Sequence, residues 1–185
     1  MKKTFFQNLF MLTATVIMLA FSGCSKSFEI KSSAFKNDER IPDQYYYVNP
    51  NTPERLNISL PLSWANPPAE TKSFALLVHH SHRAHWAVFN IPVDCRSFAE
   101  GASGKNMPGG SVELINYFRT PGYGGMEPPG DGRQTHVYNA IIYALNTDEI
   151  TINDPDVYKT VFDIENILAG KIIAQTEITG YAQIE

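Results

Sequence analysis

The sequence predicts a mainly β, single-domain protein with one clear helix near its C-terminus. Its 185 residues fit one domain, and its composition, 43% hydrophobic and 18% charged, is that of an ordinary globular protein. Three apolar runs of strand length, at 73–78, 85–91 and 137–145, predict central strands buried on both faces. The net charge of −4 gives no basic footprint, so we expect no nucleic-acid partner.

The first 23 residues have the pattern of a bacterial signal peptide. Two lysines precede the apolar stretch 9–21, which is shorter than the roughly 20 residues that span a bilayer. Ser22-Gly23-Cys24 resembles a lipobox, so we expect cleavage before Cys24 and acylation of its thiol, palmitate included. Ser25 lacks the aspartate of inner-membrane lipoproteins, which favours the outer membrane, facing the periplasm.

The next segment, 24–44, is polar and is interpreted as a tether, with the folded domain covering 45–185. Tyr45–Val48 is the first expected strand of that domain. Leu56, Ile58, Leu60 and Leu62 then alternate with less apolar residues, which predicts a strand with one apolar face.

The C-terminal part predicts a helix followed by a last strand over 171–181. Asp154 is a suitable N-cap and Pro155 suits the first helical turn. Gly170 ends the pattern. The apolar positions that fall along one side of this helix are Val157, Val161, Ile164 and Leu168.

His136 and Tyr138 lie two residues apart on one expected strand, so both side chains point to the same face. The glycine-rich segment 122–132 lets backbone N–H groups approach a phosphate or carboxylate closely. A phenol and half-protonated imidazoles would add donors. No Gly-x-Ser-x-Gly, His-Glu-x-x-His or P-loop motif is present, so we expect no enzymatic activity.

Several stretches, in the same order and spacing, resemble the phosphatidylethanolamine-binding protein (PEBP) family in its bacterial, Raf-kinase-inhibitor-like branch. They are Leu62-Ser63-Trp64 with Lys72–Val78, His85–Pro92, Pro121–Gly125 with Pro128–Asp131, and His136-Val137-Tyr138. The resemblance implies a central antiparallel sheet packed on a smaller second sheet, with one or two short helices near the C-terminus. It also implies an anion-accepting pocket at one end, which in this sequence would contain His80, His82, His85, Gly124, Gly125, Pro128, Pro129, His136 and Tyr138.

This chain departs from the family in that pocket. His80-Ser81-His82 stands where the family has Asp-Pro-Asp, and Met126-Glu127 replaces Pro-Cys. Three interpretations stay open. The histidines are tolerated loop residues, or they and Arg83 make a more electropositive anion pocket. In the third, a divalent metal such as Zn²⁺ is held by imidazoles, with Glu127 as a further ligand. The metal-ligand set would be His80, His82, His85 and His136.

The leading functional hypothesis is a lipid-anchored periplasmic protein that binds a small anionic group: phosphate, a phospholipid headgroup or a phosphorylated ligand. The first alternative is a protein–protein inhibitor of an envelope protease or another partner, and the second is a divalent-metal-binding protein. Beyond that metal no cofactor is expected. Bacterial relatives often pair, so a homodimer is suggested by analogy alone.

Overall fold

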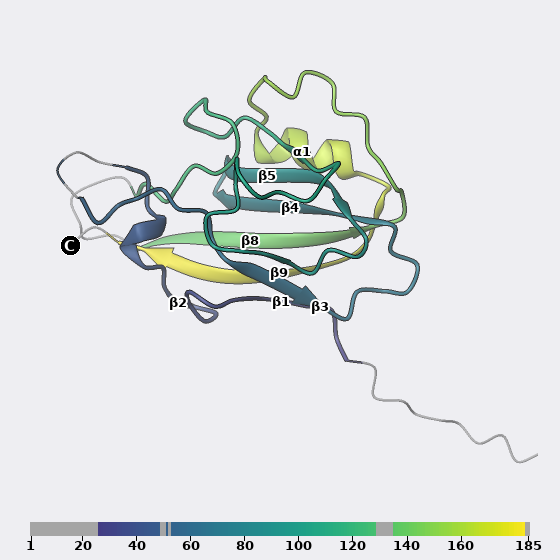
Figure 1. The fold of residues 1–185 in the computed structure, drawn as a ribbon, viewed down its shortest axis with the longest axis horizontal. Helices are drawn as coiled ribbons and strands as arrows, with labels where there is room; N and C mark the ends of the chain where they lie inside the picture. Colours follow the sequence, from purple (N-terminus) through teal and green to yellow (C-terminus); the bar gives the residue numbers. More distant parts are fainter. Residues whose placement is uncertain (1–25, 49–50, 52, 129–134, 184–185) are drawn as a thin grey trace, which may run out of the picture.

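The computed structural model describes residues 26–48, 51, 53–128 and 135–183, and its centre is a six-stranded sheet. The long strands are antiparallel, whereas β2 pairs with β9 in parallel. Figure 1 shows them as the stacked arrows through the middle of the molecule. In spatial order they are β2 (Glu39–Arg40), β9 (Ile172–Ala182), β8 (His136–Leu145), β4 (Ser73–His80), β5 (Arg83–Pro92) and β7 (Val112–Glu113).

A second, smaller sheet covers one face of the central sheet, and the helix covers the other. The small sheet has the order β1 (Glu29–Ser32), β3 (Leu62–Ala65) and β6 (Ser97–Phe98). Helix α1 (Val161–Leu168) lies on the opposite side, at the top of Figure 1. A single α-helix in the described residues and two packed sheets confirm the predicted fold class.

The two-residue period of β8 divides the core into two apolar clusters. Tyr138, Ala140 and Ile142 belong to the cluster under the small sheet. Ile141 and Tyr143 belong to the cluster under α1. Because both faces are covered, β8, its neighbour β4 and the next strand β5 contain long apolar runs, which is why the sequence predicted these three strands correctly.

The interpretation of residues 24–44 as a tether does not fit the structure. Within this segment, Glu29–Ser32 pairs antiparallel with β3, and Glu39–Arg40 pairs with the end of β9. Ile30 and Phe35 are buried in the core. The apolar positions are too few to stand out among polar neighbours, so only the tertiary packing reveals that the domain begins well before Tyr45.

Two strands expected early in the domain are shorter or absent. A 3₁₀ turn at Asp43–Tyr45 and a single bridge between Tyr46 and Met126 replace the strand expected at Tyr45–Val48. The alternating segment from Leu56 becomes a regular strand only at Leu62. Asn57 adopts a left-handed backbone with φ of 52°, which interrupts the extended conformation there.

The C-terminal helix begins six residues later than the sequence predicted. Thr160 is its N-cap and forms a reciprocal capping box with Asp163. Asp154 has a φ of 54° and does not cap the helix, and Val157 is 55% exposed rather than packed against the sheet. Ile164 and Leu168 are buried against the sheet as expected.

Candidate functional site

The candidate site lies at one end of the central sheet, where β4 ends and β5 and β8 begin. The His80 ring lies 5.2 Å from that of His136 and 5.0 Å from that of Tyr138, and the His85 ring lies 5.2 Å from that of Tyr138. In Figure 1 this is the left end of the sheet, beside the arrowhead of β9. We call these four residues the histidine–tyrosine cluster. Segments far apart in the sequence therefore bring these side chains together, as predicted.

A β-bulge positions His85 in this cluster. Val78 pairs with Trp86 and His79 pairs with Ala84, so His85 is the extra residue on β5. The side chains of His85 and Trp86 consequently contact residues of the same face, Tyr138 and Tyr123 respectively. Regular alternation would have placed them on opposite faces.

His85 is a neutral imidazole with a defined tautomer. Its Nδ1 lies 3.0 Å from the carbonyl oxygens of both Gly124 and Gly125. Because carbonyl oxygens only accept, Nδ1 carries the proton. Burial lowers the pKa of His85 to about 4, although the two hydrogen bonds to the glycine carbonyls act to raise it. The expected half-protonated imidazole is therefore not found at this position.

Gly124 and Gly125 hold His85, and their own amides are used within the fold. The Gly124 N–H donates to the His85 carbonyl at 2.7 Å, and the Gly125 N–H donates to Asn57 Oδ1 at 2.6 Å. A Cβ on Gly125 would lie 2.4 Å from backbone atoms of Tyr46 and Tyr47. Neither of these two amides is therefore free to bind an anion in this structure, because both are used in packing this segment against its neighbours.

Tyr138 has a donor left for a ligand, and the other two imidazoles each have a ring nitrogen without a partner among the described residues. The Tyr138 hydroxyl accepts from the Glu127 N–H at 3.2 Å, which leaves its own O–H to donate. Burial raises the pKa of Tyr138 far above its ordinary value, so the phenol stays protonated. His80 Nδ1 donates to the Val137 carbonyl at 2.9 Å. His136 Nε2 is buried and has no hydrogen-bond partner among the described residues.

His82 lies outside the cluster. It is exposed in the β4–β5 hairpin, where its Nδ1 lies 3.4 Å from Ser81 Oγ. Within residues 26–48, 51, 53–128 and 135–183, no group of three or more His, Cys, Asp or Glu side chains is placed to hold a metal ion. The proposed zinc ligands are therefore not assembled here. Pro128 is buried, whereas Pro129, Cys24 and the signal segment lie outside the described residues.

Aromatic side chains that the sequence did not single out surround His85. The Phe118 ring packs edge-on against His85 at 5.6 Å and stacks on Tyr47 at 3.8 Å. The Arg83 guanidinium lies 4.5 Å from the centre of the Tyr117 ring. The sequence did contain a signal for this packing, because Tyr117 and Phe118 are adjacent aromatic residues in a segment flanked by Gly and Pro. Large aromatic side chains in such a segment indicate that it packs against the domain.

Asn116 is a second residue that the sequence did not reveal. It is buried, and its Nδ2 donates to Thr120 Oγ1 and to the Gly122 carbonyl. Its Oδ1 accepts from the Phe118 N–H at 2.9 Å. Asn116 thus fixes the turn that presents Phe118 to His85.

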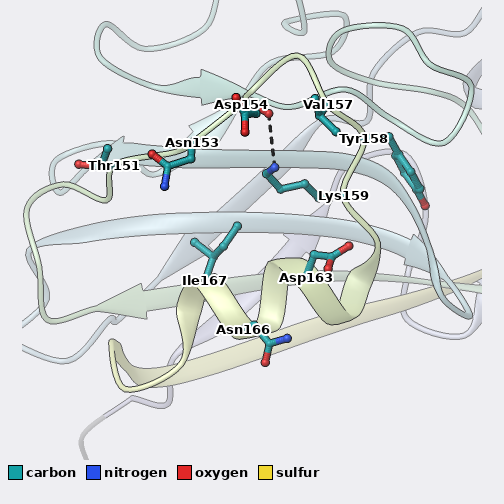
Figure 2. Close-up of a pocket in the computed structure, with 9 residues that line it drawn as sticks. All are labelled: Thr151, Asn153, Asp154, Val157, Tyr158, Lys159, Asp163, Asn166 and Ile167. Carbon is teal, nitrogen blue, oxygen red and sulfur yellow. Dashed lines mark hydrogen bonds between the residues drawn. The ribbon is translucent and has the colours of Figure 1, made fainter.

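Four of the cavities in the described part of the chain have volumes of about 270 to 450 Å³, and none of these four is lined by the histidine–tyrosine cluster. The cavity of about 450 Å³ lies between α1 and residues 151–159 (Figure 2). There Lys159 Nζ donates to the Asp154 carbonyl at 3.3 Å, the dashed line in Figure 2. This cavity contains neither histidine nor cysteine, and its position on the helix side separates it from the cluster.

Known proteins similar in sequence and in structure match most of this chain. A UPF0098 protein of Methanothermobacter thermautotrophicus is 32% identical over 157 residues, covering 82% of this chain and 95% of the relative. The UPF0098 protein YbcL of Escherichia coli is 29% identical over 185 residues, covering 95% and 98%. The crystal structure of YbcL, described as a new member of the mammalian PEBP family, superposes with a TM-score of 0.77 at 29% identity, covering 85% and 99%.

Two packed sheets with a polar cluster at one end of the larger sheet define the class to which this protein belongs. The family profile for phosphatidylethanolamine-binding protein matches residues 31–183. The chain belongs to the phosphatidylethanolamine-binding protein family.

Proposed function

We propose that this protein binds a small anionic group, phosphate or the phosphate of a larger ligand, at the histidine–tyrosine cluster and performs no chemistry on it. The observation that carries the proposal is the convergence of His80, His136 and Tyr138 around the buried His85. A phenol that stays protonated supplies a donor there, and two imidazoles each have a ring nitrogen left for the ligand. Family membership adds support, because the family is named for a phospholipid ligand.

In this proposal the side chains of the cluster, rather than the Gly124 and Gly125 amides, supply the binding. The Gly124 and Gly125 amides already donate to the His85 carbonyl and to Asn57, and Arg83 adds positive charge near His85 from the hairpin side. Hydrogen bonds from side chains to an ionised oxygen are worth roughly 1.5–3 kcal/mol each. Loss of one donor should therefore be measurable as a clear loss of affinity.

Calorimetric titration with inorganic phosphate tests the proposal. Tyr138→Phe removes only a hydroxyl, and we expect it to weaken phosphate binding about tenfold or more. His79→Gln is the matched control, because His79 is also on β4 but its Nδ1 contacts the Ser81 carbonyl and not the cluster. An unchanged affinity in Tyr138→Phe would contradict the proposed site. Stoichiometric co-purification of an envelope protein, without bound phosphate, would instead favour an inhibitor.

The proposed function includes attachment to the bacterial envelope, on the periplasmic side, through a lipid on Cys24. The support is the sequence pattern of residues 1–24. Among the described residues, no helix is long and apolar enough to cross a membrane. Metabolic labelling with radioactive palmitate tests the anchor: Cys24→Ala should abolish incorporation, and Cys95→Ala should leave it unchanged. Label retained by Cys24→Ala would refute this assignment.

A further inference from the structure

The hydrogen bonds of His85 fix which of its ring nitrogens can meet a ligand. Nδ1 is held between two carbonyl oxygens, those of Gly124 and Gly125, each 3.0 Å away. Two acceptors at that nitrogen require a proton on it. In a neutral imidazole the other nitrogen, Nε2, then has a lone pair and no proton. Nε2 is therefore a hydrogen-bond acceptor.

This acceptor has no hydrogen-bond partner in the described part of the chain and is not fully enclosed, although His85 as a whole is only 2% exposed. The side-chain polar atoms that are fully buried without a partner there are Trp64 Nε1, His136 Nε2 and Asn139 Oδ1. Nε2 of His85 is not one of them, although it too makes no hydrogen bond among these residues. It lies across the ring from Nδ1, so it points away from the glycine carbonyls. Of the two ring nitrogens it is therefore the one left for a ligand in the cluster.

We propose that His85 is a specificity-determining residue, whose Nε2 selects an oxyanion that still carries a proton, such as hydrogen phosphate or a phosphomonoester, over one that carries none, such as sulfate. This rests on the proposed function. A protonated oxygen donates to Nε2, whereas a bare anionic oxygen meets a lone pair and is repelled.

The other titratable and charged groups around His85 are not held between two carbonyl oxygens as His85 is: Arg83 and the Tyr138 hydroxyl favour any anion, and the Glu127 carboxylate repels any anion. They are His80 on β4, Arg83 on β5, His136 and Tyr138 on β8, and Glu127, whose carboxylate is exposed in the adjoining loop. Desolvation lowers the pKa of His85 to about 4, and His80 and Arg83 act in the same direction. The neutral acceptor is therefore retained at pH 6 to 7, where phosphate still carries a proton.

Competition between inorganic phosphate and sulfate at about pH 6 tests the inference on the purified full-length protein. Sulfate has the larger negative charge at this pH, so electrostatic attraction alone would favour it. We expect sulfate to bind about 10- to 100-fold more weakly than phosphate, because it has no proton to donate. Methyl phosphate should likewise bind more tightly than dimethyl phosphate, which lacks a P–OH group.

The outcomes separate this inference from the proposed function. If sulfate binds as tightly as phosphate, His85 is not a selective acceptor, although the anion site stands. If neither anion binds, the proposed function fails and the inference with it. His85→Gln can turn an amide N–H toward the ligand, so the preference for phosphate should fall to about threefold or less. His79→Gln should keep the full preference.

A spectroscopic measurement keeps the inference testable where His85→Gln does not fold. The ¹⁵N chemical shifts of the His85 ring in the wild-type protein distinguish the neutral Nδ1–H tautomer from the Nε2–H tautomer and from imidazolium. We expect the neutral Nδ1–H form throughout pH 6 to 7, both without anion and with phosphate bound. Either other form over this range would overturn the inference.

Discussion

Burial of the His85 imidazole against two backbone carbonyls makes the folded protein sensitive to acid. The pKa of His85 is about 4 in the folded protein and about 6.5 in an unfolded chain. Between these values the unfolded state binds more protons, so the free energy of unfolding falls as the pH falls. The stability that depends on neutral His85 is complete above pH 6.5 and is lost progressively toward pH 4.

We therefore predict that protonation of His85 lowers the free energy of unfolding by about 3 kcal/mol as the pH falls from 6.5 to 4. Urea unfolding across this range measures it, in the wild type and in His85→Gln. The glutamine variant cannot titrate, so its stability should change less over the same interval. Parallel pH dependences in the two proteins would show that His85 is not the group responsible.

Gly125 is the second single residue on which the site depends. A Cβ at this position would lie 2.4 to 2.5 Å from backbone atoms of residues 45–47, which cannot move away as a flexible side chain could. We predict that Gly125→Ala destabilises the protein by about 2 kcal/mol or more. Gly109→Ala is the control, since nothing lies within 4 Å of its added Cβ. Equal urea midpoints for the two variants would disprove the close packing of Gly125 against residues 45–47.

The sequence predicted which residues form the cluster better than it predicted their backbone geometry and hydrogen bonds. His85, His136 and Tyr138 could be placed together because strand periodicity and the family resemblance agree on their positions. The bulge at His85 could not be predicted, since it follows from how β4 and β5 pair. The role of Asn57 in occupying the Gly125 amide also depends on a contact between residues 68 positions apart.

At the scale of the secondary-structure element, α1 shows why helix boundaries are hard to read from sequence. Asp154-Pro155 has the residue types that begin a helix, and so does Thr160 followed by Asp163. In the structure Asp163 accepts from the Thr160 N–H at 2.8 Å, and the Thr160 hydroxyl accepts from the Asp163 N–H at 3.3 Å. The pair satisfies two amides that would otherwise be unpaired, and only the later start packs Ile164 and Leu168 against the sheet.

We predict that Thr160→Ala lowers the free energy of unfolding by about 1 kcal/mol. Asp154→Asn is the matched control, because asparagine tolerates the left-handed backbone of Asp154 and no helix begins there. It should change stability by less than about 0.5 kcal/mol. Chemical unfolding measures both variants. A larger loss of unfolding free energy in Asp154→Asn than in Thr160→Ala would favour a helix that begins at Asp154.

At the scale of the whole molecule, the strands predicted best are those buried on both faces, and those predicted worst lie at the edges. A central strand such as β4 shows its burial in nearly every residue. The edge strands β1 and β2 have four and two residues and contribute few apolar side chains each. Their assignment depends on pairing with β3 and β9, which lie far away in the sequence.

This difference gives a test of where the domain begins. A chain that starts at Ile41 lacks β1 and β2 and loses the buried side chains of Ile30 and Phe35. Burial of each is worth roughly 1.5–3 kcal/mol, so we predict that this truncation costs at least about 3 kcal/mol or prevents folding. A chain that starts at Ser27 keeps both strands and should unfold at the same urea concentration as a chain that starts at Ser25. If the segment were only a tether, all three chains would unfold at the same urea concentration, because removing a solvated linker exposes no core.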